Sequence, residues 1–258
     1  MKQGILLAAY GSGSPQAETT LKLFGAEVRA RFPGIPVRWA FTSVLLRERL
    51  AAARKKTDSV KKALQKMWFE KYTHVAVQPL QIIPGNEYAE VAAEAAAMQG
   101  APGFAVVRTG APLLSTDDDV ASAARAVLRH LPRDRAPGEA VVLMGHGARH
   151  PAVVRYADLA QAVHEHDPDV HVGAMNGAVT LEHILPRLRP GTRVWLMPLL
   201  STVGRHTLQD MAGPRPHSWR SRLEAEGVSC VPVLKGTAEY AGFINIWLDH
   251  LAEAVTSL

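Results

Sequence analysis

The chain has 258 residues, of which 47% are hydrophobic and 21% are charged. This composition is typical of a soluble globular protein with room for one large domain or two lobes. A single cysteine excludes an internal disulfide and any multi-cysteine metal site, and the formal net charge of +5 favours a polyanionic partner. No apolar run approaches the roughly 18 residues of a membrane span, and no signal-peptide pattern is present, so we expect a cytoplasmic protein with no membrane partner.

The basic residues are dispersed along the chain. Their densest cluster, Arg54-Lys55-Lys56 with Lys61 and Lys62, falls in one helical region. No aromatic RNA-binding signature or zinc-finger spacing accompanies it, so we expect no nucleic-acid partner. The positive charge suits a small polyanionic substrate instead.

The first half of the chain alternates apolar runs with helical patterns. The glycine-rich turn at residues 10–15 lacks the spacing of a phosphate-binding loop, so we expect no nucleotide. We predict strands at residues 4–9, 37–41, 74–79 and 104–108, and helices at 16–31, 45–54, 59–71, in an alanine-rich segment ending at Gly100, and from the cap at 115–118 to Leu131.

The second half repeats this pattern. Residues 5–12 match residues 141–148 in their apolar run and glycine turn, and later strands also correspond. Further strands are predicted at 170–174, 194–197 and 228–233, and helices at 151–166 and 238–255. Strands that alternate with helices favour parallel sheets. We therefore predict two similar α/β lobes, residues 1–132 and 139–258, each a parallel sheet flanked by helices, with a cleft between them. The C-terminal helix could pack back on the first lobe.

Two of the eleven histidines stand apart. His146 lies between two glycines directly after the apolar run 141–144, and His206 follows the run 194–197. Both should project from the carboxyl edge of one sheet, where open α/β sheets bind ligands. Two imidazoles at one edge can share a divalent cation, and one can accept a proton. The residues alone leave open a structural histidine in a tight turn. For eight of the others we expect surface or packing roles: His74, His130, His164, His166, His171, His183, His217 and His250.

Asn176 follows the strand 170–174 at the same edge. His146, His206 and Asn176 are therefore the candidate metal ligands. Two histidines leave most coordination positions open, which suits a metal that is handed on and not one held for structure.

The chain resembles the anaerobic-type sirohydrochlorin cobaltochelatases, class II chelatases with a ferrochelatase-like fold. The resemblance covers nearly the whole chain and rests on several motifs in the right order: residues 40–43, 78–88, 110–115, 144–148, 172–174, 196–199, His206 with 210–212, and 218–219.

The resemblance implies insertion of Co²⁺ into sirohydrochlorin, a carboxylate-rich tetrapyrrole, in anaerobic cobalamin synthesis. It places the two metal-binding histidines on His146 and His206, with His146 also as proton acceptor. The metal is a substrate, Co²⁺ with Fe²⁺ as the alternative, and no tightly bound cofactor is expected. Asn176 stands where the family has a glutamate. Glu182 is close in sequence but one and a half helical turns further on, and the alternative is that Glu87 and Glu90 of the first lobe supply the negative charge. Helix faces permit a homo-oligomer without requiring one.

The first lobe is expected to contact the tetrapyrrole. The repeat places Tyr10 opposite His146, and we predict substrate contacts from Tyr10, Ser12, Gln81 and Glu87, with plain packing as the alternative for Tyr10. Gln81 departs from relatives that often carry a histidine there. The competing functions are insertion of Fe²⁺ into the same tetrapyrrole for sirohaem, and a non-catalytic tetrapyrrole or metal carrier.

Overall fold

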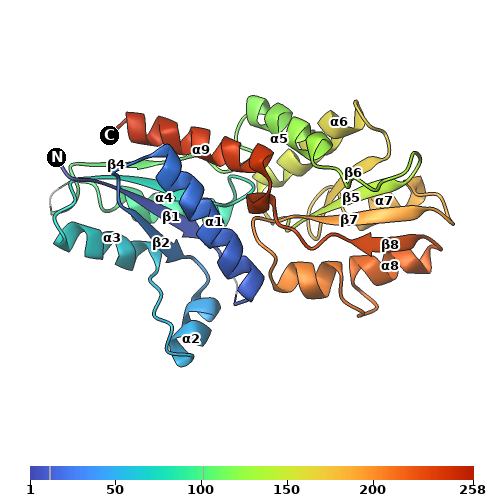
Figure 1. Cartoon of the computed structure of the whole chain (residues 1–258), viewed down its shortest axis with the longest axis horizontal. Coiled ribbons are helices and arrows are strands. Elements are labelled where there is room, and N and C mark those ends of the chain that lie inside the picture. Colours follow the sequence, from blue (N-terminus) through green and yellow to red (C-terminus); the bar gives the residue numbers. More distant parts are fainter. Residues whose placement is uncertain (12, 101) are drawn as a thin grey trace. The chain divides into compact units, whose positions relative to one another are not determined.

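The structure is a computed structural model that describes residues 1–11, 13–100 and 102–258 (Figure 1). It divides into two compact units. The first contains Met1–Leu113 and Ile244–Leu258, and the second contains Leu114–Phe243. Among the described residues, no helix is long and apolar enough to cross a membrane.

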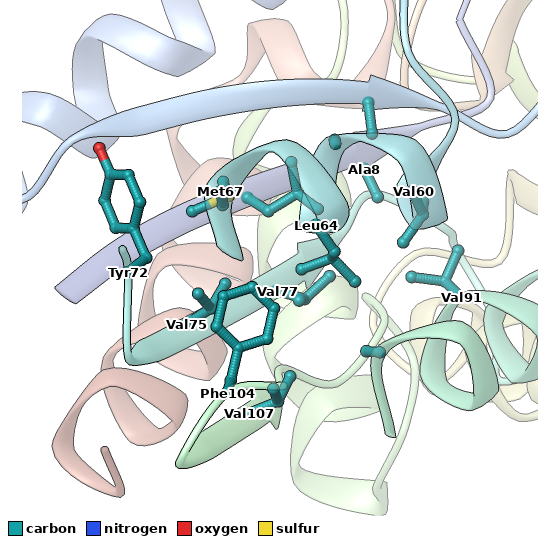
Figure 2. Close-up of a cluster of buried hydrophobic side chains, with 14 residues drawn as sticks. Ala8, Val60, Leu64, Met67, Tyr72, Val75, Val77, Val91, Phe104 and Val107 are labelled. Carbon is teal, nitrogen blue, oxygen red and sulfur yellow. The ribbon is translucent and has the colours of Figure 1, made fainter. Parts of the chain in front are cut away.

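The first unit is built on a four-stranded parallel sheet with strand order β2-β1-β3-β4. Leu6 and Ala8 of the inner strand β1 belong to a buried cluster that also includes residues of α3 and α4. Figure 2 shows Ala8 in this cluster with Leu64 of α3 and Val91 of α4. Alternation places Ile5 and Leu7, both fully buried, on the other face. The elements are β1 (Gln3–Ala9), α1 (Pro15–Arg31), β2 (Val37–Phe41), α2 (Val44–Ala52), α3 (Val60–Phe69), β3 (His74–Pro79), α4 (Asn86–Ala96), β4 (Val106–Thr109) and α9 (Ala241–Thr256).

The second unit has a parallel sheet with the corresponding order β6-β5-β7-β8. Val142 and Met144 face a cluster completed by Met211 and Trp219. The elements are α5 (Asp117–Arg129), β5 (Ala140–Gly145), η1 (Pro151–Val153), α6 (Val154–His164), β6 (Val170–Ala174), α7 (Leu181–Ile184), η2 (Leu185–Arg187), β7 (Arg193–Leu199), η3 (His206–Met211), α8 (Trp219–Ala225), β8 (Ser229–Pro232) and η4 (Thr237–Glu239).

The predicted fold class, two parallel sheets flanked by helices, is confirmed. The two sheets have the same strand order. β1 and β5 are inner strands, and the strands that follow them in the chain, β2 and β6, form one edge of each sheet. The parallel ladders bring the carboxyl ends of β5, β6 and β7 to one edge, since Gly145 pairs with Ala174 on one side and Leu199 on the other.

The division between units differs from the expected one at residues 132–139. Helix α5 belongs to the second unit, where Asp117 at its start accepts a 2.6 Å hydrogen bond from Arg155 of α6. Most of α9 belongs to the first unit, which is the alternative considered for the C-terminal helix in the sequence. There Trp247 packs edge-on against Phe24 of α1 with ring centroids 5.9 Å apart. A buried aromatic contact between distant segments leaves no local signal in the sequence.

Some elements have no counterpart in the predicted ones. The short helix α8 and the π-helix η3 carry too few turns to show a clear helical period, whereas α7 falls where His183 was expected to lie in a helix. Cys230 is buried in β8, and burial raises the pKa of its thiol to about 12.

Candidate metal and proton-transfer site

The two candidate histidines meet at the carboxyl edge of the second sheet. His146 follows β5 directly, and His206 opens η3 after the loop that leaves β7. Their ring centroids are 4.8 Å apart and the ring planes are inclined by 73°. His146 is exposed, and the side chain of His206 is 37% exposed, so both rings are accessible to a ligand.

Hydrogen bonds define which ring nitrogen of each histidine carries the proton. Nδ1 of His146 lies 3.0 Å from the carbonyl oxygen of Gly147, and Nδ1 of His206 lies 2.7 Å from Oδ2 of Asp210. A carbonyl or carboxylate oxygen only accepts, so each Nδ1 is the donor. In the neutral rings both Nε2 atoms then keep a lone pair. This arrangement is common among metal-binding histidines, whose second nitrogen donates to a carboxylate or a backbone carbonyl.

The π-helix η3 places Asp210 beside His206. Its wide turn is marked by the backbone N–H of Ala212, which donates to the carbonyl oxygen of Thr207 over 3.1 Å, a five-residue step. Single π-turns are rare and occur frequently at functional sites. Sequence reasoning included Asp210 only within a motif, because the pairing depends on this unpredicted turn.

Gly147 brings the end of β6 against the end of β5. Its φ is +76°, and a Cβ atom there would lie 1.9 Å from the backbone oxygen of Asn176. Only glycine combines this conformation with so close an approach. This contact holds the exposed Asn176 against Gly147, the residue that follows His146. Asn176 and His146 therefore lie near each other at this edge of the sheet.

The separation of the imidazoles is compatible with one shared ion. A metal–nitrogen bond of about 2.1 Å places a metal roughly 3.2 Å from each ring centroid, so two ligand rings can be no more than about 6.4 Å apart. The observed 4.8 Å satisfies this limit. The described residues contain no group of three His, Cys, Asp or Glu side chains that could hold a metal ion. Asp210 bonds Nδ1 of His206, so within the described part of the chain the pair has no further histidine, cysteine or acidic side chain that completes a metal site with it.

Glu182 is not available to replace the glutamate ligand that the family has at the position of Asn176. It accepts a 2.8 Å hydrogen bond from Arg222. The Thr180 hydroxyl, the backbone N–H and then Arg222 lower the pKa of the Glu182 carboxyl to about 2. A carboxylate already committed to these donors is poorly placed to bind a metal.

The first unit holds the predicted substrate contacts, each described here within that unit. Tyr10 follows β1 and is 48% exposed, and Glu87 is exposed in the first turn of α4. Both amide atoms of Gln81 are buried and have no hydrogen-bond partner among the described residues. Ser12 lies outside the described residues.

Comparison with known proteins gives the family. The family model "Cobalt chelatase (CbiK)" matches residues 3–256. This chain belongs to the CbiK cobalt chelatase family. The predicted family is thereby confirmed, and the chain is a metal chelatase.

Two curated relatives span this cobalt chelatase almost completely. The sirohydrochlorin cobaltochelatase CbiKC of Nitratidesulfovibrio vulgaris is 63% identical over 259 residues, covering 100% of this chain and 92% of the relative. The sirohydrochlorin cobaltochelatase of Salmonella typhimurium is 31% identical, covering 99% and 97%.

A solved chelatase structure has the same fold. The sirohydrochlorin chelatase SirB from Bacillus subtilis subspecies spizizenii, in complex with cobalt, superposes with a TM-score of 0.65 at 18% identity, covering 100% of this chain and 97% of that one. At this identity the likeness establishes the fold alone.

Proposed function

We propose that this chelatase is a sirohydrochlorin cobaltochelatase, which inserts Co²⁺ into sirohydrochlorin on the oxygen-independent route to cobalamin. The names of its two full-length relatives support this substrate pair. The observation that carries the proposal is the pairing of His146 and His206, with ring centroids 4.8 Å apart and both Nε2 atoms available. Cobalt enters as a substrate and leaves in the product, and no tightly bound cofactor takes part.

In this proposal the imidazole pair performs two tasks. The Nε2 atoms of His146 and His206 bind the incoming Co²⁺, because imidazole suits late first-row divalent metals. Insertion replaces two pyrrole N–H protons with one divalent ion. As the ion leaves the pair, Nε2 of His146 accepts one of these protons as a general base. The other proton passes to water, so charge and atoms balance.

We expect the site to bind its metal ion weakly, because none of its ligands is charged. Two neutral imidazoles and the neutral amide of Asn176 leave coordination positions open and add no negative charge. Such a site releases its ion readily to the tetrapyrrole nitrogens. A third anionic ligand would hold the ion more firmly on the protein.

Four residues of the first unit are part of the proposed substrate site. Tyr10, Ser12, Gln81 and Glu87 are proposed to contact the tetrapyrrole. The unpartnered amide of Gln81 supports a polar ligand there, because buried amide groups are normally hydrogen-bonded. Beside His206, the apolar side chain of Leu208 is 44% exposed and suits the face of a macrocycle. The net charge of +5 would attract the substrate carboxylates.

The proposal also includes a cytoplasmic location and no nucleic-acid or membrane partner. A homo-oligomer is compatible with it. None of the proposed chemical steps needs a second copy of the chain.

An absorbance assay under anaerobic conditions tests the proposal. Catalytic amounts of protein are mixed with sirohydrochlorin and either Co²⁺ or Fe²⁺. We expect many turnovers with Co²⁺ and a faster rate than with Fe²⁺. A faster rate with Fe²⁺ would assign the protein to sirohaem synthesis, and a single stoichiometric event would make it a carrier.

The matched variants are His146→Ala and His166→Ala. His166 is an exposed histidine of the same unit, beyond the end of α6. Loss of a general base and metal ligand should reduce turnover by at least about 100-fold, whereas His166→Ala should retain the wild-type rate. Near-normal turnover of a folded His146→Ala protein would contradict the assigned role.

A further inference from the structure

A concave site lies beside the edge strand β6, within the second unit. Two adjoining cavities of about 310 and 600 Å³ share three lining residues, His164, His171 and Arg187. These come from α6, β6 and η2 respectively. None of them has a role in the chelatase site.

His171 lacks the partner that a buried imidazole normally has. It is 6% exposed, and its side chain makes no hydrogen bond within the part of the chain that the structure describes. The ring of His164 lies beside it, with centroids 6.2 Å apart. The ring nitrogens of His171 are not among the fully buried atoms that lack a partner, and the residue lines both cavities, so its imidazole can bond a ligand held there.

The charges around the cavities favour an anion. Arg187 is exposed and has no ion pair or hydrogen bond from its side chain among the described residues. The smaller cavity is lined by no carboxylate. Asp169 lines the larger cavity, and the nearby Asp167 is already paired with Arg135 through bonds of 2.5 and 3.1 Å.

A metal ion fits these residues less well. Arg187 would repel a cation, and the described residues hold no three-ligand metal group. Nδ1 of His183, which also lines the smaller cavity, already accepts from the backbone N–H of Thr180 at 3.2 Å. Burial, followed by the charge of Arg187, lowers the pKa of His171 to about 4, so this ring is neutral near pH 7 and can donate one N–H.

We propose that His164, His171 and Arg187 form a binding site for a small oxyanion of the phosphate or carboxylate class. Arginine and imidazole N–H groups are strong donors to such oxygens. The smaller cavity of about 310 Å³ holds the volume of roughly ten waters at about 30 Å³ each, which admits phosphate or a small polycarboxylate but not a tetrapyrrole. The site is therefore distinct from the chelatase site and does not depend on the proposed function.

Calorimetric titration of the whole protein tests this site, in an oxyanion-free buffer near pH 7 without cobalt or tetrapyrrole. Inorganic phosphate and citrate are titrated separately, so that the two arms identify the anion class. We expect saturable binding of at least one anion at one site per chain. Arg187→Gln should weaken it by about tenfold or more, because a charge-assisted hydrogen bond is lost.

Arg125→Gln is the matched control, since Arg125 is an exposed arginine of the same unit that lines neither cavity. It should bind the anion as the wild type does. Chelatase turnover of Arg187→Gln should be unchanged, which separates this result from the test of the chelatase site.

Three outcomes would overturn the proposal. The first is no saturable binding of either anion at millimolar concentration. The second is equal binding by wild type and Arg187→Gln. The third is Co²⁺ binding that persists in His146→Ala and disappears in His171→Gln, which would make the cavity a cation site.

Discussion

Nδ1 of His206 lies 2.7 Å from Oδ2 of Asp210, within the single wide turn of η3. This contact fixes the orientation of the imidazole and directs its Nε2 lone pair away from the carboxylate. We propose that Asp210 is a positioning residue, since it contacts Nδ1 of His206 and makes no proposed contact with the metal. The chemistry of the site therefore depends on a residue whose place in the fold comes from a rare helical geometry.

Asp210→Asn should weaken Co²⁺ binding and lower turnover by about 10- to 100-fold, the range typical for loss of a partner behind a metal-binding histidine. Asparagine keeps the size but can present its NH₂ group to Nδ1, which favours the wrong tautomer. Steady-state kinetics and anaerobic Co²⁺ titration measure the effect. Asp118→Asn, at an exposed position of α5, is the control. Wild-type Co²⁺ affinity in Asp210→Asn would remove the positioning role.

Asn176→Glu should tighten Co²⁺ binding, because it adds an anionic oxygen ligand beside the imidazole pair. If release of the ion limits turnover, kcat should fall while cobalt affinity rises. Visible absorption of bound Co²⁺ and parallel kinetics measure both. Asn245→Glu adds the same charge at an exposed position on α9 in the first unit and should leave affinity unchanged. Equal effects of the two variants would attribute the change to net charge alone.

Gly147→Ala should destabilise the second unit and displace the metal site. The added Cβ would lie 1.9 Å from the backbone oxygen of Asn176, and φ is +76°. Backbone strain costs of order 1–3 kcal/mol, and the clash adds to it. Gly138→Ala separates these terms, since Gly138 has φ +81° with nothing near its Cβ position. Urea unfolding should show a larger loss for Gly147→Ala, and equal losses would contradict the close approach.

Stability should fall between about pH 6.5 and pH 4 through His171. Burial first, then Arg187 and His164, lower its folded pKa to about 4, while Asp169 and Asp167 oppose the shift. The unfolded chain therefore takes up a proton that the folded chain does not, so stability decreases as pH falls through this window, by about 3 kcal/mol in total. Unfolding at pH 7 and pH 4.5 in an oxyanion-free buffer measures the change.

His171→Gln has no titrating group at that position and should lose less stability over the same interval. His166→Ala serves as the control for removal of an exposed histidine. If wild type and His171→Gln lose stability equally, the imidazole of His171 does not supply the pH dependence.

The repeated strands made most of the fold predictable. Apolar runs such as residues 141–144 and 194–197 mark buried parallel strands, and residues that follow such strands share an edge. This logic predicts that His146, His206 and Asn176 lie at one edge of the second sheet. The family resemblance then gave the chemistry that spacing alone left open.

Other features depend on tertiary contacts that a linear pattern does not carry. The boundary between units follows the packing of Trp247 on Phe24 and the pairing of Asp117 with Arg155. The role of Asp210 depends on a π-turn, and the ordinary helical period does not indicate one. His164 and His171 were expected to be structural residues, and only the cavities beside Arg187 suggest a ligand.

The central claim is that His146 and His206 bind one cobalt ion together. Crystals of the protein soaked anaerobically with Co²⁺, and measured on both sides of the cobalt absorption edge, test it most directly. We expect one principal anomalous peak within about 2.0–2.2 Å of both Nε2 atoms. A cobalt ion bound by only one of these histidines, or at a different group of residues, would contradict it.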